Sequence, residues 1–186
     1  MARTPSNMMP LGTKAPDFSL SDTVSGTDMT LDELSGTAGT VVMFICNHCP
    51  FVKHVNAGIV ALAKDYQDKG IGFVAISSND VENYPQDGPE LMKENALQEG
   101  FTFPYLYDES QEVATSYDAA CTPDFYLFDS ELKLVYRGQL DASRPENGIP
   151  VTGMDMRNAL EAVLAGKQVE PNQKPSIGCN IKWKVA

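Results

Sequence analysis

A change of hydrophobic period across residues 40–66 constrains the fold more than any other feature of the sequence. Residues 40–45 form an apolar, β-branched run of strand length, and Cys46 and Cys49 follow it with two residues between them. From Pro50 onward, apolar side chains recur every three or four residues, as on one face of a helix. They are Phe51, Val55, Ile59, Leu62 and Tyr66. The pattern predicts a buried strand that runs directly into a long helix, with both cysteines at the corner.

Similar patterns predict the other elements of the chain. We expect strands at residues 15–20, 71–77, 103–107, 125–128 and 132–140, and helices or helical turns at residues 30–34, 89–99, 110–117 and 154–164. The last two strands are joined at Asp129-Ser130, which is a hairpin signal. Strand–helix units followed by a hairpin and a closing helix predict an α/β sandwich with a mixed central β-sheet.

The length of 186 residues suits a single domain over residues 1–186. Residues 1–12 are polar and rich in proline, and we expect them to be a mobile N-terminus. Residues 167–186 form a tail with apolar side chains at alternating positions, namely Ile177, Cys179, Ile181 and Trp183. Such a tail is too apolar to stay in water, so we expect it to pack on the body.

Composition narrows the classes of partner and the compartment. The formal net charge is −11, which disfavours binding to nucleic acid or to an anionic membrane. We find neither an apolar stretch of membrane-spanning length nor the apolar core of a signal peptide, and we therefore expect a cytoplasmic protein. Four cysteines are too few for a disulfide framework, so a closely spaced pair indicates catalysis, redox sensing or metal binding.

The pair Cys46 and Cys49 has the spacing of a redox couple. A helix that begins directly after Cys46 would place its free N–H groups near that sulfur and stabilise a thiolate there. Cys49 would lie within disulfide reach and could resolve a mixed disulfide. His48, between them, would stabilise the thiolate, shuttle a proton, or serve only as a solvated spacer.

Two other interpretations of the pair stay open. Two small buried hydrophobic residues would need no chemistry, although a strand–helix corner is an unusual place for them. A metal site would need two further ligands, and no second closely spaced pair is present. We therefore predict no metal and no cofactor.

The segment Cys121-Thr122-Pro123 precedes an expected strand. A threonine–proline step at this place favours a cis peptide bond, whereas an ordinary trans proline is the alternative. Because proline has no N–H group, the backbone of Thr122 would be free to pair with an incoming extended chain.

Three segments together resemble the thioredoxin-like superfamily, in the branch of the alkyl hydroperoxide reductase/thiol-specific antioxidant proteins, or redoxins. They are A-P-D-F-S-L at 15–20, F-I-C-N-H-C-P at 44–50 and C-T-P-D-F-Y-L-F-D at 121–129. The resemblance implies a thioredoxin-like sandwich with an N-terminal strand extension. It also implies Cys46 as nucleophile, Cys49 as resolving cysteine, Pro123 as a cis-proline facing them and Thr122 as a peptide-binding residue. Cys121 would then be either a third redox thiol or a bystander.

The expected function is a thiol–disulfide oxidoreductase that acts on disulfide-containing proteins or small thiols. A thiol-dependent peroxidase is the alternative, but peroxiredoxins carry a Pro-x-x-x-Thr/Ser-x-x-Cys pattern. With Cys49 at its last position, Val42 and Cys46 replace the proline and the hydroxyl residue. Arg137 or Arg144 would have to supply the guanidinium of such a site. A non-catalytic thioredoxin-like binding module, with or without a metal, is a further alternative.

Overall fold

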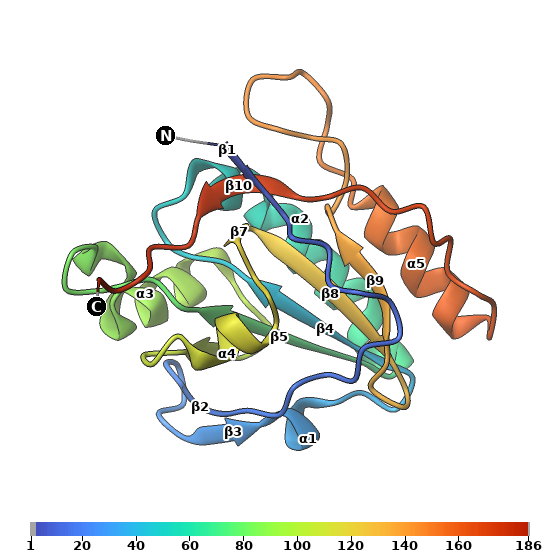
Figure 1. Cartoon of the computed structure of the whole chain (residues 1–186), viewed down its shortest axis with the longest axis horizontal. Coiled ribbons are helices and arrows are strands. Elements are labelled where there is room, and N and C mark those ends of the chain that lie inside the picture. Colours follow the sequence, from blue (N-terminus) through green and yellow to red (C-terminus); the bar gives the residue numbers. More distant parts are fainter. Residues whose placement is uncertain (1–2, 186) are drawn as a thin grey trace.

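The computed structural model describes residues 3–185, and a seven-stranded mixed sheet forms its centre (Figure 1). The strands are β1 (Arg3–Pro5), β2 (Ser19–Asp22), β3 (Asp28–Thr30), β4 (Gly39–Phe44), β5 (Ile71–Ser77), β6 (Tyr105–Tyr107), β7 (Cys121–Thr122), β8 (Asp124–Asp129), β9 (Leu134–Gly138) and β10 (Ile177–Asn180). The helices are α1 (Leu31–Leu34), α2 (Pro50–Tyr66), α3 (Pro89–Glu99), α4 (Glu112–Ser116) and α5 (Met154–Leu164), with 3₁₀ turns η1 (Gln67–Lys69) and η2 (Pro85–Asp87).

The central sheet has the order β3-β2-β6-β5-β4-β8-β9. Strand β5 is parallel to both β4 and β6, whereas β8 is antiparallel to β4 and to β9. Parallel neighbours need a crossover connection, and helices α2 and α3 provide the two crossovers. The predicted mixed sheet and the hairpin of β8 and β9 are therefore confirmed.

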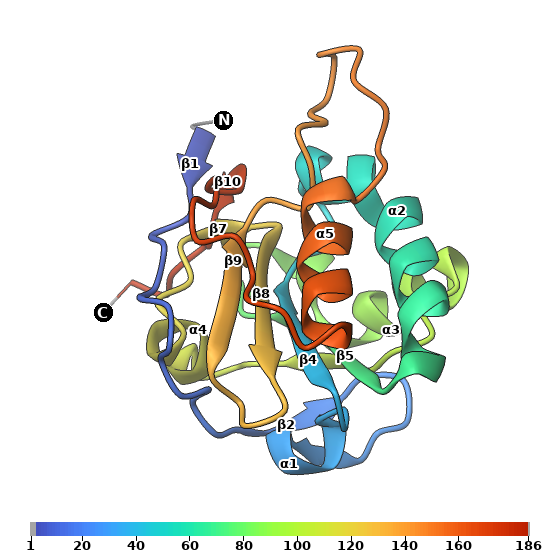
Figure 2. The same ribbon diagram turned by 90° about the vertical axis from the view of Figure 1, so that its right-hand side faces the viewer.

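Strand β4 is buried on both faces, which explains its unbroken apolar run. Its side chains alternate between two cores. Val41, Met43 and Ile45 belong to the core under α2, α3 and α5, whereas Val42 and Phe44 belong to the core under α4 and the N-terminal segment. Figure 2 shows α2, α3 and α5 on one side of the sheet and α4 on the other. The strand thus holds the segment that follows it, with both cysteines, against the middle of the molecule.

Helix α2 begins at Pro50, where a missing N–H group costs least, and Cys49 is its N-cap residue. Its apolar face is buried, with Ile59 and Leu62 both 0 % exposed. Full burial of a side chain of this size contributes about 1.5–3 kcal/mol. Beyond η1, Gly70 has φ +86°, and a Cβ there would lie 2.6 Å from Thr37 Oγ1, so this turn requires glycine. Within residues 3–185, no helix is long and apolar enough to cross a membrane.

The N-terminal segment differs from the expectation of a mobile stretch over residues 1–12. Strand β1 pairs with β10, and β10 pairs with β7, which makes a second, three-stranded sheet. Met9 is also buried. The segment is held because the tail offers it a row of backbone partners, which composition alone does not reveal. Residues 1 and 2 lie outside the described residues, as does residue 186 of the tail.

Candidate active site

Cys46 and Cys49 lie at the corner between β4 and α2, as the sequence predicted. Cys46 comes two residues after the last residue of β4, and Cys49 caps α2. They are 1 % and 0 % exposed. The two thiols lie close enough to shift the pKa of each other.

The loop before β8 faces this pair. The Thr122–Pro123 peptide bond is cis, which agrees with the expectation from the sequence. The Thr122 carbonyl oxygen lies 3.3 Å from the Cys49 sulfur, and the Thr122 hydroxyl lies 3.4 Å from the Cys46 sulfur. A single residue next to the cis-proline therefore contacts both thiols.

The pKa values of Cys46 and Cys49 shift in opposite directions, and the lowered one belongs to Cys49, whereas the sequence predicted a thiolate on Cys46. The hydrogen bond from Cys46 lowers the pKa of Cys49 to about 5, although burial opposes this change. The Cys179 thiol and the backbone N–H groups of Val52 and Cys179 lower it further. In contrast, the hydrogen bond to Cys49, burial and the negative charge of Asp87 raise the pKa of Cys46.

The lowered pKa therefore falls on Cys49, whereas the sequence predicted a thiolate on Cys46, and the position of the helix contributes to this difference. Helix α2 begins after Cys49 rather than after Cys46. Cys49 is therefore the residue nearest the free N–H groups of the first turn, where an anion is favoured.

His48 is held by Asp87, a residue that the sequence analysis did not identify. The His48 Nδ1 atom lies 2.5 Å from Oδ2 of Asp87, which is 0 % exposed. Asp87 also accepts hydrogen bonds from the backbone N–H groups of Asn47 and His48 and from the Asn79 side chain. The ring of Tyr84 stacks on His48 at a centroid distance of 5.7 Å. His48 is therefore a fixed part of the corner and not a solvated spacer.

Three of these residues could act as metal ligands by position. Potential ligand atoms of Cys46, His48 and Asp87 all lie within 4.8 Å of one another. However, each carboxylate oxygen of Asp87 already has two hydrogen-bond partners. One partner of Oδ2 is the imidazole of His48. The cluster fits an imidazole–carboxylate pair beside a thiol, and a metal would have to break that pair.

The tail brings a third sulfur to the site. The Cys179 sulfur on β10 lies 2.9 Å from the Cys49 sulfur. The strand pairing sets Cys179 opposite Thr122, and a Cβ on Gly178 would lie 1.9 Å from the Thr122 carbonyl oxygen. The expectation that the Thr122 backbone is free for an incoming chain is therefore wrong for this state, because the chain's own apolar tail occupies that edge.

Cys121 is the third thiol that the sequence suggested, but it lies differently. Its sulfur is 3.8 Å from the Pro123 carbonyl oxygen, and its partner across the strand pair is Asn180. Burial raises the pKa of the Cys121 thiol, as does the charge of Asp124. Thr122, the next residue, contacts the thiol site, whereas the Cys121 thiol faces the Pro123 carbonyl oxygen.

The two arginines considered for a peroxidase site bond elsewhere. Arg137 donates to the Met9 carbonyl and to the Gln173 side chain. Arg144 donates to the carbonyl groups of Asp141 and Ser143 and to the side chain of Gln139.

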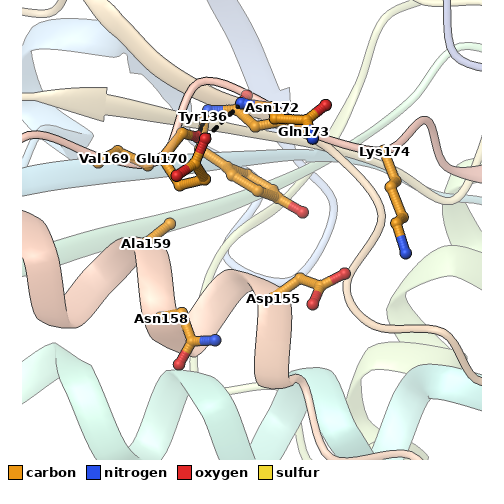
Figure 3. A pocket seen from close by; sticks show the side chains of 9 residues that line it. All are labelled: Tyr136, Asp155, Asn158, Ala159, Val169, Glu170, Asn172, Gln173 and Lys174. Atoms are coloured by element: carbon orange, nitrogen blue, oxygen red, sulfur yellow. Dashed lines mark hydrogen bonds between the residues drawn. The ribbon is translucent and has the colours of Figure 1, made fainter.

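A pocket of about 180 Å³ lies between β9, α5 and the start of the tail (Figure 3). The side chains that line it include Tyr136, Asp155, Gln173 and Lys174. Gln173 bonds to the backbone of Val135 and Glu170, so its polar groups are engaged within the fold. No cysteine lines this pocket, which separates it from the thiol site.

The sheet, the cysteine pair at the strand–helix corner and the facing cis-proline define a thioredoxin-like redox protein. More particularly, the chain belongs to the AhpC/TSA family, whose sequence profile matches residues 11–137.

Two solved structures are similar to this chain over nearly its whole length. An uncharacterized conserved protein from Geobacillus kaustophilus is 61 % identical, with a TM-score of 0.99, over 100 % of this chain and 98 % of that chain. A hypothetical protein from Sinorhizobium meliloti 1021 is 48 % identical, with a TM-score of 0.96, over 98 % of this chain and 100 % of that chain.

A more distant structure shares the fold alone. The peroxidoxin BcpB from Mycobacterium tuberculosis is 19 % identical, with a TM-score of 0.61, over 85 % of this chain and 97 % of that chain. A search of curated proteins found no match.

Proposed function

We propose that the protein is a thiol–disulfide oxidoreductase in which Cys46 and Cys49 alternate between dithiol and disulfide. One observation carries this proposal: Cys46 and Cys49 lie together at the start of a helix, and Thr122, the residue before the cis-proline, contacts both sulfurs. The lowered pKa of Cys49 favours the thiolate, which is the form that attacks disulfides. Substrates would be disulfide-containing proteins or small thiols.

The order of the steps follows from the acidities. The Cys49 thiolate attacks one sulfur of a substrate disulfide, the substrate S–S bond breaks, and its other sulfur leaves as a thiolate. The Cys46 thiol then loses its proton to solvent and attacks the Cys49 sulfur. This second step closes the Cys46–Cys49 disulfide and releases the remaining substrate thiolate. The roles expected from the sequence are therefore exchanged.

A substrate reaches Cys49 only when β10 moves, because this sulfur is 0 % exposed and Cys179 lies against it. Removal of β10 from β7 also uncovers the backbone of Thr122, next to the cis-proline. An extended substrate segment would then take the place of β10 as a strand beside β7.

His48 and Asp87 act as positioning residues. Asp87 accepts the N–H groups of Asn47 and His48 and thereby fixes the segment between the two cysteines. A fixed segment holds Cys46 within reach of Cys49 in both redox states.

The test is a redox titration of the Cys179→Ser variant, in which the pair is separated from the third sulfur. Against glutathione buffers, we expect one reversible two-electron transition, with an internal disulfide in the tryptic peptide 15–53 that holds both cysteines. Cys121→Ser is the matched control and should titrate like the unmodified chain. A pair that stays reduced at every oxidising poise, or that oxidises irreversibly, would contradict the proposal.

Peroxide reduction is the second candidate, because the pKa of Cys49 is lowered and a thiolate is the form that peroxide oxidises. Its sulfur would become a sulfenic acid, and Cys46 would resolve it to a disulfide and water. Stopped-flow mixing with hydrogen peroxide measures the rate directly, with Cys49→Ser as the blank. A rate no faster than that of an ordinary free thiol excludes this activity, and the engaged arginines favour that outcome.

A further inference from the structure

We propose that Cys179 is a second resolving thiol, which closes a disulfide with Cys49 in place of Cys46. The proposal rests on the proposed function, because it needs Cys49 to carry a mixed disulfide. The Cys46–Cys49 motif supplies two redox cysteines, and the proposal adds Cys179, which is 130 residues away from Cys49 in the sequence.

The contact between the two sulfurs carries the proposal. They lie 2.9 Å apart, and a disulfide bond is about 2.05 Å long, so closure needs a shift of less than ~1 Å. Both side chains are buried, with Cys179 1 % exposed. The pKa of Cys179 is raised to about 12 by burial and by the hydrogen bond to Cys49. Cys179 therefore rests as a thiol and has to lose its proton before it attacks.

The strand that carries Cys179 is fixed on both sides. In the pairing of β10, Cys179 lies opposite Arg3 of β1 and opposite Thr122 of β7 (Figure 1). Three residues before Cys179, the Ser176 hydroxyl donates to the Pro123 carbonyl oxygen, and the Ser176 N–H group donates to Ser6 Oγ. These bonds hold the tail against the cis-proline loop. The short distance between the Cys49 and Cys179 sulfurs is therefore set by strand pairing and hydrogen bonds of the tail.

The chemistry balances without a further reactant. After attack on a substrate disulfide, Cys49 is joined to one substrate sulfur. When β10 returns to β7, the Cys179 thiol loses its proton to solvent and attacks the Cys49 sulfur, the bond from Cys49 to the substrate breaks, and the substrate sulfur leaves as a thiolate. The two electrons that reduced the substrate disulfide come from the Cys49 and Cys179 thiols. The product holds β10 over the site by a covalent bond.

Disulfide mapping of the Cys46→Ser variant tests the closure itself. Diamide accepts two electrons and two protons, and we expect it to link tryptic peptide 15–53, which holds Cys49, to peptide 168–182, which holds Cys179. The link should persist in Cys46→Ser/Cys121→Ser. If diamide leaves both thiols open to alkylation, or links peptide 15–53 to the Cys121 peptide 94–133 instead, the proposal is overturned.

A trapping experiment separates resolution from mere proximity. The aromatic disulfide 5,5′-dithiobis(2-nitrobenzoate) releases one coloured thiolate on attack and a second when the adduct is resolved. In a Cys121→Ser background, we expect Cys46→Ser to release two per chain, and Cys46→Ser/Cys179→Ser to release one and keep the adduct on Cys49. An adduct equally stable in both variants contradicts a resolving role for Cys179.

The two proposals fail in different ways. Loss of the Cys46–Cys49 disulfide in Cys179→Ser counts against the proposed function alone. Loss of the Cys49–Cys179 link in Cys46→Ser counts against the third thiol alone. Circular dichroism and thermal unfolding of each variant establish that the fold is intact before either result is interpreted.

Discussion

At the scale of single residues, the site depends on how three sulfurs share protons around Cys49. The pKa of Cys49 is lowered, and the pKa values of Cys46 and Cys179 are raised. Cys46 and Cys179 become harder to ionise beside Cys49, because a second negative charge next to the first is disfavoured. Among these three thiols, Cys49 is therefore the one whose pKa is lowered.

Replacement of Cys46 by alanine removes the largest of the effects that lower the pKa of Cys49. We expect this pKa to rise from about 5 toward the ordinary value, so the thiolate fraction at pH 6 should fall by about tenfold or more. The rate of alkylation of Cys49 by iodoacetamide as a function of pH measures this change. Cys121→Ala is the control and should leave the midpoint where it was; an unchanged midpoint in Cys46→Ala contradicts the account.

Replacement of Asp87 by asparagine removes a buried charge that raises the pKa of Cys46. We expect the pKa of Cys46 to fall and the free energy of unfolding to fall by about 1.5–3 kcal/mol, because charged hydrogen bonds to Asn47 and His48 are lost. Site-resolved alkylation and urea unfolding measure the two effects. A variant with unaltered Cys46 reactivity and full stability would show that Asp87 does not position the site.

The motif itself led to Cys46, Cys49 and Pro123, since a strand–helix corner and a threonine–proline step are local patterns. Asp87 and Cys179 had no such signal, because they reach the site from 39 and 130 residues away from their partners. The pKa values of the two cysteines could not be predicted from the sequence either. They depend in part on whether α2 begins after Cys46 or after Cys49, and this difference is only three residues.

At the scale of elements, β10 is the strand on which access to the site depends. It pairs with β7 beside the cis-proline, and Gly178 allows it to approach the Thr122 carbonyl. Strands β4, β5 and β8 of the central sheet were predictable because their apolar runs are long, whereas β3 is only three residues long and was not predicted. Strands β1, β7 and β10 are only two to four residues long, and their pairing depends on contacts between distant segments rather than on a local period.

Alanine at Gly178 cannot fit without moving β10, since its Cβ would lie 1.9 Å from the Thr122 carbonyl oxygen. We expect the variant to expose Cys49 and to raise its reaction rate with 5,5′-dithiobis(2-nitrobenzoate) by about tenfold or more. Asn180→Ala, at an exposed position of the same strand, is the matched control and should react like the unmodified chain. If Gly178→Ala reacts no faster than this control, β10 does not limit access.

At the scale of the whole molecule, both ends of the chain meet at the buried Asp124. Its carboxylate accepts hydrogen bonds from Ser6 and Tyr126, and Ser6 in turn contacts Ser176 of the tail. Burial raises the pKa of Asp124 to about 7, and those hydrogen bonds only partly offset the effect. The junction of the two ends with the body is therefore sensitive to pH.

This shift predicts how stability depends on pH. Because the folded pKa is above that of the unfolded chain, the folded state binds the extra proton, and this stabilisation is present below pH 4 and is lost as pH rises through about 7. Relative to Asp124→Asn, the free energy of unfolding should fall by roughly 2–4 kcal/mol over that window. Urea unfolding at several pH values measures the difference between the two proteins. A difference that does not change with pH would contradict the buried, protonated carboxyl.

In the proposed mechanism, the resting negative charge of the site lies on Cys49. The ultraviolet absorbance of thiolate, followed as a function of pH in the reduced chain, measures where this charge lies. We expect a step with a midpoint near pH 5 that disappears in Cys49→Ser. A first thiol that ionises only near pH ~8.5, as in free cysteine, or a step that survives in Cys49→Ser and disappears in Cys46→Ser, would contradict it.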